Sequence, residues 1–198
     1  MDALIEKLKN IEHGFKHIIE AGDYILKDTS IDHFELATKL LDDEAYQIRM
    51  LSTYLLGQLS AVNTKALEIL ETKVARDDNW RVQEMLAKAF DHYCQTIGYE
   101  RSLPKIRNWI NDENPNITRA VIEGLRIWTS RPYFKENPEV AIQLIASSRS
   151  TDSEYLRKSI GNSLRDISKK HKGLVDNEVS GWNSADKKIV FIKKLIYK

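Results

Sequence analysis

The sequence predicts an all-α fold built from stacked antiparallel helix pairs, an α-solenoid with a concave face. Apolar residues recur at helical spacing through most of the 198 residues, and no segment shows a convincing strand pattern. Glycine (8 residues) and proline (4 residues) are scarce, which argues against an all-β fold with many tight turns. A two-helix segment also repeats along the chain, as is typical of solenoids.

The N-terminal part of the chain predicts two amphipathic helices. The first apolar stripe consists of Leu4, Ile5, Leu8, Ile11 and Phe15, and the second of Phe34, Ala37, Leu40 and Leu41. His13 and His17 lie four apart on the first predicted helix, a spacing that can bind zinc. No third ligand is evident nearby, so a solvated helix face is the favoured interpretation and no metal is expected.

Capping residues predict where the later helices begin and end. The predicted N-caps are Asn114 and Asn137, each followed by proline, together with Ser102, Ser153 and Ser184. The predicted stops are Gly22, Gly98 and Gly173. Residues 129–138 are predicted to form a loop that either touches a partner or caps the stack, and the lysine-rich C-terminus to form an amphipathic helix that closes it.

Four segments share one plan, an acidic or polar turn followed by a helix with apolar residues at matched places. They are residues 42–59, 77–94, 112–129 and 151–168, and the alignment of Ile48, Val82, Ile117 and Leu156 shows a nearly constant step between copies. Another amphipathic helix precedes each of them, in residues 31–41, 63–74, 102–110 and 138–147. Two helices in roughly 35–40 residues is the period of HEAT-like repeats. We therefore expect residues 1–198 to form a single HEAT-like-repeat domain whose second helices line the concave surface.

The composition excludes several classes of protein. Hydrophobic residues make up 42% of the chain, which is incompatible with wholesale disorder. Cys94 is the only cysteine, so it is predicted to be a small buried hydrophobe rather than part of a disulfide or a cysteine-based zinc site. No apolar run approaches the roughly 20 residues of a membrane span, and no signal peptide is evident, so a cytoplasmic protein is expected. The absence of a glycine-rich phosphate loop argues against a nucleotide cofactor.

The net charge of +1 hides an asymmetry along the chain. Residues 1–148 contain 18 Lys and Arg against 23 Asp and Glu, whereas residues 149–198 contain 12 against 6. This excess of six positive charges predicts an anionic partner near the C-terminal quarter. The alternative is a set of solvated helix faces whose charges happen to cluster.

The second helices carry polar and aromatic residues that a purely structural stack does not need. Trp80 and Glu84 are four apart and share a helix face, and Arg119 and Glu123 repeat this spacing. The other candidates are Arg126, Trp128, Arg157, Lys158, Asn162, Arg165 and Asp166. Each pair has a structural alternative, since an Arg and a Glu four apart also form ordinary surface ion pairs and tryptophan is usually core.

Three stretches closely resemble the bacterial DNA alkylation repair family, the HEAT-like-repeat alkylpurine DNA glycosylases of the AlkD and AlkC type. They are NWRVQEMLAKAFDHYC, NPNITRAVIEGLRIWTSRPYFKENPEVAI and SEYLRKSIGNSLRDISKKH, within residues 75–175. The most specific parts are the R-x-x-x-E-G-x-R run from Arg119 to Arg126 and the run over residues 153–167.

This resemblance implies excision of N3- and N7-alkylated purines without a metal or other cofactor. The base is cationic and leaves easily, so a carboxylate needs only to stabilise an oxocarbenium-like sugar and position water. Aromatic faces attract the cationic base, while arginines and lysines hold the flanking phosphates. The resemblance assigns catalysis to Glu123 first, then Glu84 and Asp166; an aromatic wall to Trp80 and Trp128; and DNA binding to Arg119, Arg126, Arg157, Lys158 and Arg165.

The match to the family pattern is incomplete at three places, one of which is Trp128, a stand-in for an AlkC-type tryptophan that is offset in this sequence. Glu84 is one methylene longer than the Asp of the AlkD-type pair, and Asn162 stands where that type has its second aromatic residue. We therefore expect the protein to be a monomer that binds duplex DNA on a concave basic face. Its expected activity is that of an alkylpurine DNA glycosylase. The alternatives are a relative that binds DNA without excision and a HEAT-like scaffold that binds another protein.

Overall fold

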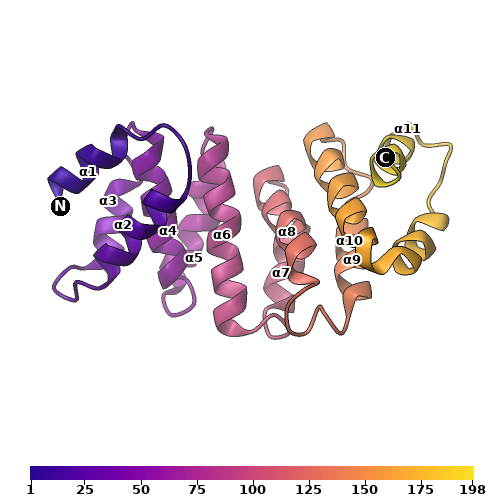
Figure 1. Cartoon of the computed structure of the whole chain (residues 1–198), viewed down its shortest axis with the longest axis horizontal. Coiled ribbons are helices and arrows are strands. Elements are labelled where there is room, and N and C mark those ends of the chain that lie inside the picture. The colour runs from indigo at the N-terminus through magenta and orange to yellow at the C-terminus, as the bar shows by residue number, and fades with distance from the viewer. The chain divides into compact units, whose positions relative to one another are not determined.

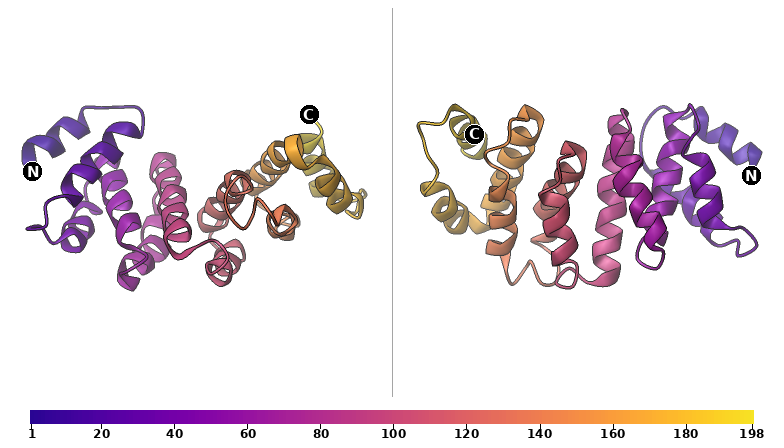
Figure 2. Two further views of the ribbon diagram at one scale, coloured as in Figure 1. Left: turned by 60° about the horizontal axis from the view of Figure 1, so that its bottom comes forward. Right: turned by 180° about the vertical axis from the view of Figure 1, so that it is seen from behind.

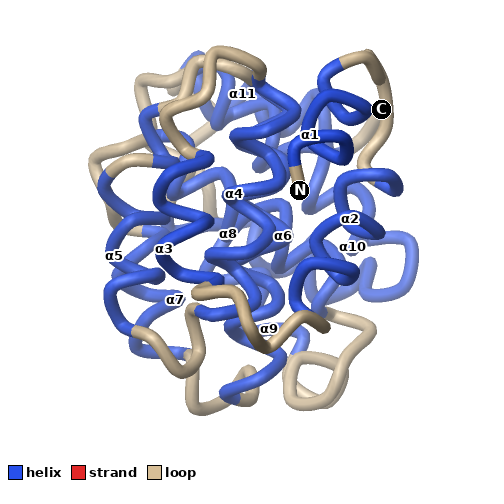
Figure 3. Tube along the Cα trace, turned by 90° about the vertical axis from the view of Figure 1, so that its left-hand side faces the viewer, coloured by secondary structure: helices blue, strands red, loops and turns tan.

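A computed structural model describes all 198 residues, and every regular element in it is a helix (Figures 1 and 3). The elements are α1 (Asp2–Lys9), α2 (Lys16–Leu26), α3 (His33–Leu40), α4 (Tyr46–Leu59), α5 (Thr64–Thr72), the 3₁₀ turn η1 (Val74–Arg76), α6 (Trp80–Ile97), α7 (Leu103–Ile110), α8 (Pro115–Trp128), α9 (Pro138–Ser147), α10 (Glu154–Ser180) and α11 (Lys187–Ile196). The predicted all-α fold is confirmed. Contacts divide the chain into two compact units, unit 1 (Met1–Ile97) and unit 2 (Gly98–Lys198).

The four predicted helix pairs are present. In chain order they are α3 with α4 and α5 with α6 in unit 1, and α7 with α8 and α9 with α10 in unit 2 (Figure 2). The two helices pack against each other in three of these pairs, whereas α5 packs against α4 and is connected to α6 through η1. A turn of a few residues joins the two helices of each pair, a connection that makes neighbouring helices antiparallel. None of the helices combines the length and the apolar composition needed to cross a bilayer.

The turn within each pair is built in the same way four times. A polar side chain accepts a hydrogen bond of 2.8–3.2 Å from the backbone N–H two residues later; these residues are Asp43, Asp77, Asp112 and Thr151. The backbone carbonyl of the same residue accepts a bond of 2.9–3.1 Å from the side chain six residues later; the donors are Arg49, Gln83, Thr118 and Arg157. Both sets recur at the same steps as the aligned segments of the sequence, so the repeat is structural as well as compositional.

Several predicted helix boundaries are confirmed. Asn114 caps α8 by accepting a bond from the Asn116 N–H, and Ser153 caps α10 through the Leu156 N–H. Gly98 follows α6 with a φ of 94°, in the left-handed region that glycine enters without strain. Asn137 and Ser102 stand just before α9 and α7, but their side chains bond to loop carbonyls instead of capping the helices.

Other predicted boundaries are wrong. Only the first three residues of the first apolar stripe, Leu4, Ile5 and Leu8, lie in a helix, because the chain leaves α1 after Lys9 and turns at Gly14, whose φ is 98°. Ile11 and Phe15 lie in the connection before α2. Gly22 lies inside α2, where a Cβ would sit 2.2 Å from the Tyr54 ring. Asp186 caps α11, not Ser184, and α10 is broken at His171 rather than ending at Gly173.

Unit 1 has its core around α4, which packs against α2, α3, α5 and α6. Gly57 of α4 lies so close to Ala89 of α6 that a Cβ on it would be 2.7 Å from the Ala89 Cα. Cys94 is fully buried in this core, as predicted. The close α4–α6 contact fixes the helix that begins at Trp80.

Unit 2 has its core between α8, α9, α10 and α11. The loop of residues 129–137 folds back and buries Phe134 completely, so part of this loop is core. The C-terminal helix α11 packs its apolar side against α10, where Gly161 allows close approach to Leu195. The predicted closing helix is therefore present.

Candidate functional site

Unit 2 brings two of the three predicted carboxylates together at the contact between α8 and α10. One nitrogen of Arg126 lies 3.3 Å from a carboxylate oxygen of Glu123 and 3.7 Å from one of Asp166. The Glu123 side chain is 17% exposed and that of Asp166 30% exposed. Carboxylates from two different helices thus share one arginine, which offsets much of their negative charge.

Asp166 is further stabilised in its ionised form. Lys169, one turn later on α10, donates a hydrogen bond of 2.7 Å to its carboxylate and is the main reason that the pKa of Asp166 is lowered. The positive charges of Arg126 and Arg165 act in the same direction. Asp166 is therefore a persistent anion surrounded by cations.

A cavity of about 180 Å³ adjoins this cluster. Its lining combines cationic and hydroxyl groups and consists of Arg126, Ile127, Thr129, Ser130, Asp166, Ile167, Lys170 and His171. The break in α10 at His171 lies at its edge. No tryptophan, tyrosine or phenylalanine ring lines the cavity, and the imidazole of His171 is its one aromatic group.

Trp128 lies apart from this cavity, in the core of unit 2. It is 1% exposed and packs against Tyr99 and Phe134, with ring centroids 5.2 and 5.9 Å away. Its indole also fills the space beside Gly124, where a Cβ would come within 2.5 Å of the ring. This placement differs from the predicted aromatic wall, because a base cannot stack on a ring that the core covers.

The predicted DNA-binding cations do not share one environment. Arg157 donates to the turn carbonyls of Thr151 and Asp152 and stacks over Phe191 of α11, so it belongs to the repeated turn described above. The Arg119 guanidinium lies 4.9 Å from the centre of the Tyr155 ring. Arg157 therefore serves the turn and the contact with α11, and its role in DNA binding stays a prediction.

Lys158 and Arg165 lie at the surface of α10. They are seven apart on α10, so they lie on one helix face, and Asn162 lies between them. Lys158 forms only an exposed ion pair with Glu154, at 2.8 Å. Arg165 is partly exposed and forms no ion pair or hydrogen bond of its own.

Unit 1 contains the other predicted pair, Trp80 and Glu84, at the start of α6. Trp80 is 53% exposed, and it is the only tryptophan of the chain that is not buried. Glu84 is half-buried one helical turn later. Unit 1 thus combines a partly exposed tryptophan ring with a carboxylate one helical turn later.

The groups that surround Trp80 were not predicted from the sequence. The Arg81 guanidinium stacks over Trp80 and over Tyr46, with 4.5 and 5.0 Å to the ring centres. A signal was available, because Tyr46 occupies the same position as Trp80 in the preceding copy of the repeat. Arg81 also bonds to His13, which lies in the loop between α1 and α2 and not on one helix with His17. No group of three or more His, Cys, Asp or Glu side chains is placed to hold a metal ion.

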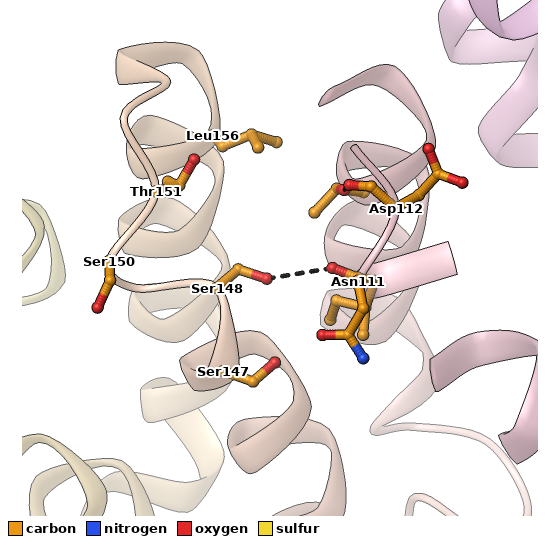
Figure 4. Close-up of a pocket in the computed structure, with 9 residues that line it drawn as sticks. Asn111, Asp112, Ser147, Ser148, Ser150, Thr151 and Leu156 are labelled. Carbon is orange, nitrogen blue, oxygen red and sulfur yellow. Dashed lines mark hydrogen bonds between the residues drawn. The ribbon is translucent and has the colours of Figure 1, made fainter. Parts of the chain in front are cut away.

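A second cavity in unit 2, of about 230 Å³, was also missed. It lies between the α7–α8 and α9–α10 turns, and hydroxyl groups dominate its lining, which includes Ser147, Ser148, Ser150 and Thr151 (Figure 4). The Ser148 hydroxyl donates across it to the Ile110 carbonyl at 3.5 Å. The run SSRST over residues 147–151 was the available signal.

Comparison with solved structures identifies two close relatives over the whole chain. AlkD2 from Streptococcus mutans is 44% identical, with a TM-score of 0.93, and the match covers 100% of this chain and 95% of that one. The protein smu.31 from Streptococcus mutans UA159 is 41% identical, with a TM-score of 0.89 and coverage of 100% and 97%. The chain therefore has the all-helical, HEAT-like fold of AlkD-type proteins.

Sequence comparisons agree with this result. The uncharacterized protein YhaZ of Bacillus subtilis (strain 168) is 29% identical over 90 residues, which are 43% of this chain and 25% of YhaZ. The match thus spans only a quarter of that relative's length. The family described as DNA alkylation repair enzyme matches residues 21–186, which is most of the chain. The chain belongs to the DNA alkylation repair enzyme family.

Proposed function

We propose that the chain binds duplex DNA and that the surface formed by α8 and α10 holds the phosphate backbone. The observation that carries this proposal is the row of Lys158, Asn162 and Arg165 on one face of α10. The cavity at the contact with α8 adds two cations, Arg126 and Lys170, and two hydroxyl groups beside Asp166. The Arg165 side chain is partly exposed and forms no direct ion pair or hydrogen bond within the chain. The exposed pair of Lys158 with Glu154 contributes little stability, so Lys158 readily exchanges that carboxylate for a phosphate.

Two further observations support a nucleic-acid backbone as the ligand. Phosphate oxygens are contacted by arginine, lysine and hydroxyl groups, the types gathered here. Residues 149–198 also carry the positive excess of the chain. The proposal includes two expectations from the sequence. The DNA-binding surface is a concave basic face, and residues 1–198 form a single domain.

Salt-dependent binding to duplex DNA tests the proposal. Replacing Lys158 and Arg165 with alanine should weaken binding to all sequences alike, because phosphate contacts carry no base information. The slope of log affinity against log salt should flatten by roughly one unit for each phosphate contact removed. The matched control replaces two exposed lysines of unit 1, Lys65 and Lys73, and removes the same charge. Equal salt slopes in the two double variants would refute a phosphate-binding role for the α10 row.

Excision of N3- or N7-alkylated purines is a second candidate function, which the exposed face of Trp80 favours. A cationic base stacks on tryptophan, and Glu84 one turn later supplies the negative charge that stabilises an oxocarbenium-like sugar. We propose Glu84 ahead of Glu123 for this role, because Trp128 is buried and no aromatic carbocycle lines the cavity beside Glu123.

Incubation with duplex DNA that contains N-methylpurines separates the candidates. Release of free base supports a glycosylase. Salt-sensitive DNA binding without base release supports a relative that binds DNA without this chemistry. No affinity for duplex DNA at any moderate salt concentration would leave a scaffold that binds another protein.

A further inference from the structure

Arg81 occupies the aromatic face on which the proposed excision depends. Its guanidinium stacks over both Trp80 and Tyr46, and these are the first residues of α6 and α4. Neighbouring residues on a helix do not face each other, so the Arg81 side chain must fold back across the start of α6 to reach Trp80. The contact is therefore specific and does not follow from helix geometry alone.

The Arg81 side chain is held by the rings of Trp80 and Tyr46 and by the imidazole of His13, without a contact to a carboxylate. Arg81 forms no ion pair, and its hydrogen-bonding partner is the His13 Nδ1 atom at 3.2 Å. Tyr46 is fixed in turn, because its hydroxyl donates to the Glu12 carbonyl at 2.5 Å. The rings of Trp80 and Tyr46 attract the guanidinium although no carboxylate assists them. They therefore form a site that attracts a cation through its charge alone.

The loop of residues 10–15 keeps this arrangement in place. Gln47 of α4 donates to the carbonyls of Lys9 and Ile11, which ties the loop to α4. The ammonium of Lys88 lies 5.6 Å from the centre of the Phe15 ring, two helical turns beyond Arg81 on α6. Positions 81, 84 and 88 share one helix face, so the 10–15 loop runs along the face that carries Glu84.

We propose that Arg81 is an internal occupant of a cation site formed by Trp80 and Tyr46, and that it must leave these rings before a cationic purine can stack on Trp80. The 10–15 loop holds Arg81 in the site through His13. This inference rests on the second candidate function for the choice of ligand, a positively charged methylpurine. It makes the chain's own arginine a competitor of that ligand.

Fluorescence of Trp80 tests the proposal without DNA and without excision. The other three tryptophans, Trp109, Trp128 and Trp182, are buried, so quenching by a small ligand reports on Trp80. The probe is 1-methyladenosine, which remains a cation at pH 7, with adenosine as the uncharged match. Arg81→Ala should bind 1-methyladenosine about fivefold more tightly than the parent, the change expected when one cation–π competitor is removed.

Matched variants distinguish occupancy from a structural role. Lys88→Ala removes another α6 cation that stacks on a ring, and it should leave the affinity unchanged. Arg81→Lys should retain most of the block, because an ammonium also stacks on Trp80. His13→Ala should raise the affinity less than Arg81→Ala, since the arginine stays but loses its anchor. Circular dichroism and thermal melting establish that each variant is folded.

Two results would overturn the proposal. One is an Arg81→Ala variant, folded like the parent, whose affinity for 1-methyladenosine is equal or lower, which would make Arg81 a support for Trp80 rather than its occupant. The other is an equal gain for adenosine, which would show that the arginine blocks space and not charge. Neither result depends on base release or on the salt dependence of DNA binding. Those two measurements test the proposed function, so the two proposals can fail independently of each other.

Discussion

The two units place the same residue types in opposite environments. In unit 1, Trp80 exposes half of its surface at the start of a helix, and Glu84 follows one turn later. In unit 2, Trp128 is buried in an aromatic cluster, while Glu123 and Asp166 share Arg126. The presence of an aromatic residue and a carboxylate therefore does not define a site. What matters is whether the ring beside the carboxylate remains open to a ligand.

The largest expected effect is on stability and separates the two tryptophans. Trp128→Ala should lower the free energy of unfolding by about 3–5 kcal/mol, because it removes a fully buried ring from the contact with Tyr99 and Phe134. Trp80→Ala should cost less than about 1 kcal/mol, since the ring is half in solvent. Urea unfolding of both variants measures the difference, and similar losses would mean that Trp80 is core as well.

A medium effect should separate the two arginines at the same repeat position. Arg49 and Arg157 both donate to turn carbonyls, but Arg49 also forms a two-point contact of 2.6 and 3.1 Å with Asp77, whose side chain is 7% exposed. Arg49→Ala should therefore destabilise by about 2–3 kcal/mol and Arg157→Ala by about 1 kcal/mol. Arg157→Ala should also leave the salt slope of DNA binding unchanged. A flattened slope would return Arg157 to the phosphate-binding residues.

The smallest expected effect is a difference in pH dependence. Burial lowers the pKa of His17, whose Nε2 atom is enclosed without a partner, and burial also lowers the pKa of His92. Because the pKa of each histidine is lower in the folded state, protons bind preferentially to the unfolded chain. The stability that the neutral histidines contribute is therefore complete above pH 6.5 and is lost as the pH falls through their folded-state pKa values. The pKa of Asp166 in unit 2 is also lowered, so its contribution to stability is likewise lost on acidification. That loss begins only when the pH falls below the ordinary aspartate pKa of 3.8.

Thermal melting between pH 7.5 and 5 checks this difference. The parent should lose stability over this range, and a variant with His17→Gln and His92→Gln should lose less. Asp166→Asn should leave the slope in this range unchanged, because Asp166 is ionised throughout it. A slope that survives both histidine replacements would place its origin elsewhere.

The repeat and the helix pairs could be predicted from the sequence because they depend on local patterns. Apolar periodicity and turn residues recur in every copy of the repeat, and the same residues form the turns in the structure. Gly22 was misread because its close contact is with Tyr54, which lies on another helix, α4. A glycine that makes room for a distant ring has no local signature.

The candidate sites were harder to predict for the same reason. The burial of Trp128 depends on how the 129–137 loop folds back, and the neutralising contact of Arg126 with Asp166 joins two separate helices. The role of Arg157 was accessible in principle, since it aligns with Arg49 and both serve a turn. The stacking of Arg81 on Trp80 was not, because adjacent helical residues ordinarily point apart.

Base release by paired carboxylate variants tests most directly whether the purine site lies in unit 1. Free base, DNA affinity and melting temperature are measured on the same preparations of the parent, Glu84→Gln and Glu123→Gln, with N-methylpurine duplexes as substrate. We expect Glu84→Gln to reduce release about a hundredfold at unchanged DNA affinity. Glu123→Gln should lower the melting temperature, because it weakens the contact with Arg126, and leave release by the folded protein unchanged. Undiminished release by Glu84→Gln together with a hundredfold loss in a fully stable Glu123→Gln would place the site in unit 2, and no release by the parent would remove the excision chemistry altogether.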